Sequence, residues 1–182
     1  MKACVLLSLV VLTSACATSK YSFAGGSADP VVAKAQFEKL KSLAGEWSGT
    51  GGDATQSFPM EVRYRVTAGG SAVEETLFQG TEHEMITLYH MDGNRLMLTH
   101  YCAAGNQPSM VARSTPTDGS ASTIRFDFTG ATNLASDADG HMHEAEITFE
   151  DTSHIKSRWT YFQDGKPGHQ AHFDLSRKSA SG

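Results

Sequence analysis

The chain has 182 residues, 40% of them hydrophobic, and carries 15 Lys and Arg against 20 Asp and Glu, for a formal net charge of −5. This length suits one domain with room for a substantial core. The mild acidity and the lack of any Lys/Arg cluster exclude the charge pattern of a nucleic-acid-binding protein, so we expect no nucleic acid as a partner.

Residues 1–17, MKACVLLSLVVLTSACA, have the organisation of a secretory signal peptide. Lys2 precedes an apolar run that is too short for a stable membrane anchor, and small residues follow. Two cleavage patterns compete here. Thr13–Cys16 resembles the bacterial lipoprotein box, in which Cys16 is lipidated, whereas Ala15–Ala17 fits ordinary small-x-small cleavage. We favour the lipoprotein because a cysteine at that position is uncommon by chance, although Thr13 stands where the box usually has leucine.

The resemblance to bacterial lipoproteins implies an outer-membrane protein that faces the periplasm and touches the membrane only through its lipid anchor. Residues 18–28 are polar and glycine-containing, as in a flexible tether, and residues 29–182 form the predicted domain. Cys4 and Cys16 belong to the leader, so Cys102 is the one thiol of the domain and no intradomain disulfide is possible.

The first predicted element of the domain is a helix that starts at Asp29 and Pro30. Asp is a favoured N-cap, and Pro is tolerated at the first helical position. The segment VVAKAQFEKLKSLA that follows repeats apolar residues at helical spacing, and Gly45 is a natural stop. One amphipathic helix in front of an otherwise β-rich chain is expected to cap one end of a sheet or barrel.

From Glu46 onward the hydrophobic period is two, which predicts strands. Turn pairs such as Asp92–Gly93, Asp118–Gly119 and Asp164–Gly165 separate them. About ten short strands joined by tight turns predict a mainly β fold, an antiparallel up-and-down barrel that escapes its edges by closing. The predicted strands are Glu46–Gly51, Met60–Thr67, Ser71–Gln79, Glu84–Met91, Arg95–Cys102, Ser109–Ser114, Thr123–Thr129, His141–Glu150, His154–Phe162 and Gln170–Arg177.

The start of the β region, LAGEWSGTG, contains a G-x-W motif formed by Gly45 and Trp47 and resembles the first strand of the calycin superfamily, which includes the lipocalins. The longer G-x-W-x-G-x-G resembles nitrobindin-type haem-binding barrels. In calycins this Trp packs across the barrel end beside a basic residue of the last strand, which implies that Trp47 lies beside Arg177. The block HEMITLYHMDGNRLMLTHYCAAGNQP resembles segments of secreted bacterial proteins, which implies no particular activity.

Alternate side chains of a barrel strand face the lumen, so the face assignment identifies candidate site residues. A two-residue turn at Asp92–Gly93 would pair Met85 with His100 and His83 with Cys102. His141 and His143 share a strand face with the apolar Ala145, Ile147 and Phe149 and are therefore predicted on the buried face of their strand. Trp159, Tyr161 and His169 are predicted to face the lumen, and Ala103–Pro108, with Asn106, is predicted to form part of its rim.

These residues allow several functions. We favour a cell-envelope barrel that binds a small hydrophobic or haem-like molecule through His100, Cys102, Asn106, His141, His143, Trp159, Tyr161 and His169. The resemblance to nitrobindins implies His169 as a haem ligand. Alternatively, His100, Cys102, His141 and His143 bind a transition metal at the barrel mouth, or form the site of a metal-dependent or Cys/His-dependent enzyme.

Overall fold

The computed structural model describes residues 29–114 and 122–179. The predicted signal peptide, Cys16, the tether and the Asp118–Gly119 turn lie outside the described residues. Within the described ranges, no helix is both long enough and apolar enough to cross a membrane.

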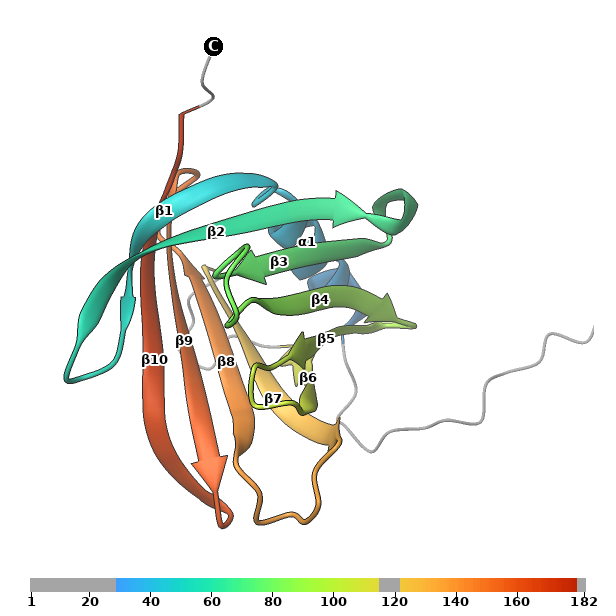
Figure 1. Ribbon diagram of the computed structural model, residues 1–182. Coiled ribbons are helices and arrows are strands. Elements are labelled where there is room, and N and C mark those ends of the chain that lie inside the picture. The colour runs from blue at the N-terminus through green and yellow to red at the C-terminus, as the bar shows by residue number, and fades with distance from the viewer. Residues whose placement is uncertain (1–28, 115–121, 180–182) are drawn as a thin grey trace, which may run out of the picture.

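Helix α1 spans Pro30–Lys41; it begins where Asp29 and Pro30 predict, and it ends before Ala44, the last residue of the predicted helical segment. The carboxylate of Asp29 caps it by accepting a hydrogen bond of 2.8 Å from the backbone N–H of Val31. Its buried face, formed by Ala33, Phe37 and Leu40, packs against strands β4 and β5 (Figure 1). The helix thereby covers one end of the β structure.

The remaining elements confirm the predicted fold class. Ten antiparallel strands form a closed barrel in which each strand pairs with its sequence neighbours and β1 pairs with β10 (Figure 1). Closure leaves none of the described strands at a free sheet edge. The strands are β1 Gly45–Gly52, β2 Ser57–Thr67, β3 Ala72–Leu77, β4 Met85–Asp92, β5 Arg95–Tyr101, β6 Gln107–Ala112, β7 Thr123–Thr132, β8 His141–Phe149, β9 His154–Gln163 and β10 Lys166–Arg177, with a short 3₁₀ turn, Ala68–Gly70, between β2 and β3.

Trp47 and Arg177 lie together at the barrel end that α1 covers. They are directly paired between β1 and β10, and the guanidinium of Arg177 lies 4.4 Å from the centre of the Trp47 ring. The same guanidinium donates to the carbonyls of Ser42 and Ala44, at 2.7 Å and 2.8 Å, and so holds the segment between α1 and β1. This is the geometry that the G-x-W resemblance implies.

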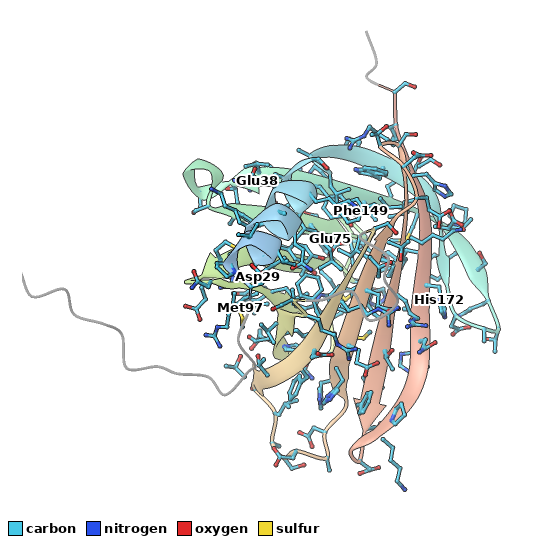
Figure 2. The ribbon with its side chains drawn as sticks, turned by 180° about the vertical axis from the view of Figure 1, so that it is seen from behind. Asp29, Glu38, Glu75, Met97, Phe149 and His172 are labelled. Carbon is cyan, nitrogen blue, oxygen red and sulfur yellow. The ribbon has the colours of Figure 1, made fainter. Side chains whose placement is uncertain are left out.

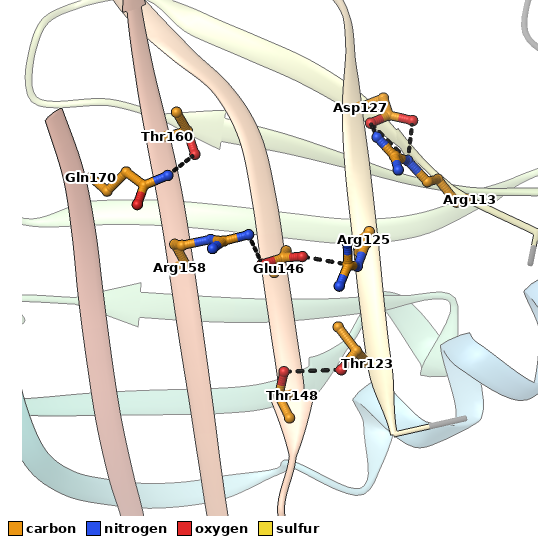
Figure 3. A network of polar contacts seen from close by, with 9 residues as sticks. All are labelled: Arg113, Thr123, Arg125, Asp127, Glu146, Thr148, Arg158, Thr160 and Gln170. Carbon is orange, nitrogen blue, oxygen red and sulfur yellow. Dashed lines mark hydrogen bonds and ion pairs between the residues drawn. The ribbon is translucent and has the colours of Figure 1, made fainter. Parts of the chain in front are cut away.

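The outer surface of the barrel carries a ladder of charges across β7, β8 and β9. Glu146 of β8 accepts from Arg125 of β7 at 2.8 Å and from Arg158 of β9 on its other side (Figure 3). Such cross-strand pairs on a partly exposed face each contribute about 0.2–1 kcal/mol. These charged residues therefore strengthen the outer wall of the barrel.

The hairpin of β4 and β5 differs from the predicted register. Its turn is Gly93–Asn94, not Asp92–Gly93, because Gly93 takes a φ of 58° and Asp92 forms an ion pair with Arg95 opposite it. His100 consequently pairs with Thr87 instead of Met85. Each residue of β5 therefore pairs with a β4 residue two positions further along than predicted. Because side chains alternate with a period of two, this shift leaves the same residues together on each face.

Candidate functional site

A cavity of about 200 Å³ lies at the barrel end opposite α1. The residues around it come from the end of β1, β3 and β5 and from the start of β2, β4, β8 and β10, which the antiparallel topology brings to one rim. Most of the wall is apolar and is formed by Phe58, Leu77, Phe78, Met142, Ala171 and Phe173. The position follows from the fold, because α1 covers the other end of the barrel.

His100 of β5 and Trp159 of β9 form part of the wall of this cavity. His100 is 2% exposed, and its ring lies 4.8 Å from that of Trp159, centre to centre. Its Nδ1 lies 2.9 Å from the hydroxyl of Thr87, the residue paired with it on β4. Burial lowers the pKa of His100 from 6.5 to about 4, so the imidazole is neutral near pH 7.

Behind His100 lies a buried carboxyl group, Glu75 of β3, which is 1% exposed and lies inside the barrel (Figure 2). The hydroxyl of Tyr64 donates to its Oε1 at 2.6 Å, and that of Tyr89 donates to its Oε2 at 2.7 Å. Burial raises the pKa of Glu75, and the hydroxyls of Tyr64, Tyr89 and Thr87 offset part of that increase. Two tyrosines therefore satisfy both oxygens of this buried carboxyl group.

Glu75 and Tyr64 were not among the site residues predicted from the sequence. The sequence nevertheless contained a signal, because Glu75 is two residues from both Val73 and Leu77 and so shares the buried face of its strand with them. A carboxylate among apolar residues of one face is a buried polar group that needs partners. What the pattern could not supply was the identity of those partners, which lie on the neighbouring strands β2 and β4.

His141 and His143 occupy a different place from His100. The register of β8 against β9 shifts between Met142 and Glu144, so that Met142 lines the cavity, contrary to the simple alternation that predicted the histidines there. The two imidazoles line a separate cavity near the β7–β8 loop. His141 Nε2 lies 3.0 Å from His143 Nδ1, and the His143 ring is stacked between Phe128 and Phe162 at 4.6 Å and 4.0 Å.

The remaining predicted site residues lie around the open end. His169 is an exposed residue that lines the cavity, and its ring stacks on Tyr161 at 4.6 Å. Asn106 is buried and donates to the carbonyl of Gly140 at 2.9 Å, which ties the β5–β6 loop to the β7–β8 loop. Cys102 follows the end of β5, and its backbone N–H donates to the carbonyl of Asn106, so it belongs to a turn.

The predicted metal site of His100, Cys102, His141 and His143 is therefore not assembled. In residues 29–114 and 122–179, no group of three or more His, Cys, Asp or Glu side chains is placed to hold a metal ion. The physical reason is that the bulge in β8 takes both of its histidines away from the cavity that His100 lines. The same separation removes the basis for an enzyme site made from these four residues.

Haem, which the nitrobindin resemblance implies, does not fit the cavity. Its volume of about 200 Å³ is below the about 300–1,000 Å³ typical of sites that enclose drug-sized ligands, and a tetrapyrrole is larger than most of those. His169, the implied ligand, is exposed, and its ring is stacked on Tyr161. These residues do not form a haem pocket.

Comparison with known proteins adds no assignment. No protein-family profile matches the chain, and no curated protein matches it.

Proposed function

We propose that this protein binds a small, largely apolar molecule in the lumen of a calycin-like barrel of the bacterial cell envelope. The observation that carries the proposal is the apolar cavity at the open end, with His100 as a polar contact in its wall. Ligand sites commonly combine such an apolar wall with a few fixed polar groups. The leader-like N-terminal sequence and its lipoprotein box support the envelope location, and the Trp47–Arg177 contact supports the calycin relationship.

The volume of the cavity limits the size of the ligand. An engineered apolar cavity of about 150 Å³ binds benzene, and the cavity here, at about 200 Å³, is slightly larger. One ring with a small substituent, or a short hydrocarbon chain, therefore fills it. Of the two ligand classes predicted from the sequence, the small hydrophobic molecule is the one that we propose.

Titration calorimetry of the purified protein with toluene tests this function. We expect binding to the wild type and a loss of binding in Ala171→Trp, because Ala171 lines the cavity and an indole there occupies it. Cys102→Ser is the matched control, since Cys102 lies in the turn after β5, and it should bind toluene as the wild type does. If Ala171→Trp disturbs the fold, the milder change Ala171→Leu replaces it in the test and should weaken toluene binding. Absence of toluene binding to the folded wild type would reject the proposed function.

A further inference from the structure

The two histidines of β8 belong to a second cavity, of about 230 Å³, whose lining residues come partly from the β7–β8 loop and the β9–β10 turn. We infer that this cavity is a separate binding site for a small molecule with an O–H or N–H group, which donates a hydrogen bond to Nε2 of His143. The inference goes beyond the proposed function, because this cavity shares no lining residue with the one beside His100.

The wall of the second cavity combines apolar side chains with a few polar ones. Phe128 of β7, Leu134 of the β7–β8 loop and Phe162 of β9 form its apolar part. The polar side chains are those of His141, His143 and Asp137. An engineered cavity of about 150 Å³ binds benzene, so a single ring with a hydroxyl or amino substituent fits this larger space.

The hydrogen bonds of the histidine pair determine where each neutral ring carries its hydrogen. Nδ1 of His141 lies 2.8 Å from the backbone carbonyl oxygen of Asp139, which can only accept, so this nitrogen carries the hydrogen. Nε2 of the same ring is then an acceptor, because a neutral imidazole has one N–H. Nδ1 of His143 lies 3.0 Å from that acceptor and therefore donates to it. The neutral ring of His143 has its free lone pair on Nε2.

The packing around His143 leaves only the Nε2 edge of its ring for the cavity. The ring is stacked between Phe128 and Phe162, at interplanar angles of 21° and 19°, so both of its faces are covered. His141 occupies the Nδ1 edge. His143 nevertheless lines the cavity and is only partly buried. The ring atoms that reach the cavity are therefore those around Nε2, the nitrogen with the free lone pair.

The bulge in β8 is the local feature that produces this arrangement. His143 is the extra residue between Met142 and Glu144, and it has no partner on β9. Bulges re-aim a side chain out of the regular alternation of a strand and are frequent beside functional sites. Burial and repulsion from His141 lower the pKa of His143, which favours the neutral ring that can accept.

The polar side chains that remain available to a ligand accept hydrogen bonds and do not donate them. Both nitrogens of His141 are already bonded, and His143 offers a lone pair. Asp137 carries a carboxyl group, which accepts when it is ionised. None of the described residues that line this cavity is Lys or Arg. A ligand with acceptors alone would lose hydration without a side-chain partner, whereas a donor such as phenol has one.

Nuclear magnetic resonance of the wild-type protein tests the inference without any variant. Imidazole ¹⁵N shifts in long-range proton–nitrogen spectra, recorded at about pH 8 where a typical histidine is neutral, show which nitrogen carries the hydrogen. We expect the hydrogen on Nδ1 in both His141 and His143. Titration with phenol should shift the Nε2 resonance of His143 until it saturates, whereas toluene should leave it in place. A hydrogen on Nε2 of His143, or no shift with phenol, would overturn the inference.

His143→Phe provides a second test, because it keeps an aromatic ring between Phe128 and Phe162 but removes the acceptor. The backbone amide shifts of Leu134 and Gly165 report phenol binding at this cavity alone. We expect the affinity for phenol there to fall about tenfold. His83→Phe, the same change at an exposed position, is the matched control and should bind phenol as the wild type does.

An unchanged affinity for phenol in folded His143→Phe would also overturn the inference. Neither result depends on toluene binding beside His100, so the inference and the proposed function can fail separately. If His143→Phe does not fold, the wild-type titration still decides between binding through Nε2 and no binding.

Discussion

Replacing His100 by phenylalanine should change how the stability of the barrel depends on pH. In the folded protein the pKa of His100 is about 4, against 6.5 for an unperturbed histidine, because the ring is buried. Between these values the unfolded chain binds a proton that the folded chain does not, so stability is lost as the pH falls. From the two pKa values, this histidine lowers the free energy of unfolding by about 2 kcal/mol between about pH 7 and about pH 5, and by about 3 kcal/mol at about pH 4.

Urea unfolding at these pH values, followed by the fluorescence of Trp47 and Trp159, measures the effect. The wild type should lose about 2 kcal/mol more than His100→Phe between about pH 7 and about pH 5. Glu75 titrates with the opposite sign, because its folded pKa is raised, but it is present in both proteins and largely cancels in the difference. His83→Asn, at an exposed position, serves as the control and should follow the wild type. Parallel loss of stability in wild type and His100→Phe would refute the reasoning.

Three further predictions concern Glu75, Gly49 and Asp29. Because the folded pKa of Glu75 is raised, stability is lost as the pH rises above about 4.5 toward that folded value; urea unfolding of Glu75→Gln from acid to neutral pH should lack this fall, and an identical profile would contradict the burial argument. Gly49→Ala should lower the unfolding free energy by about 2 kcal/mol or more, measured by urea unfolding, because its Cβ would lie 2.0 Å from the carbonyl oxygen of Asp174 and must displace β10. Asp29→Ala should cost about 0.5–2 kcal/mol of unfolding free energy by removing the cap on Val31, whereas Asp29→Asn should retain most of it.

The local patterns of the chain determined most of the fold. Asp29–Pro30 and the apolar spacing after it correctly placed α1, and the period of two from Glu46 predicted all ten strands of the barrel. The residues of the β4–β5 hairpin were also correctly grouped into two faces, even though the turn lies one residue further on. These successes have one physical cause: helical and strand periods are set by backbone geometry over a few residues, and a side chain's face depends only on that period.

The candidate site was predicted only in part, because it depends on contacts between strands and not on the period within one strand. His100 and Trp159 share the cavity as their faces suggest, but His143 sits at a bulge that the sequence does not mark, and the bulge moves both β8 histidines to another cavity. The register shift depends on how β8 meets β9, which is a property of the pair and not of either strand.

The sequence by itself determined which residues could turn inward, namely Glu75 beside Val73 and Leu77, and His100 beside Leu98. Only the tertiary structure decided that Glu75 meets Tyr64 and that Thr87 meets His100, because those contacts join different strands. It also decided the volume of the cavity, which depends on how side chains from strands across the whole barrel pack at one end. The period of the side chains is a local property of the sequence, whereas the cavity and the contacts around it form only when the barrel closes.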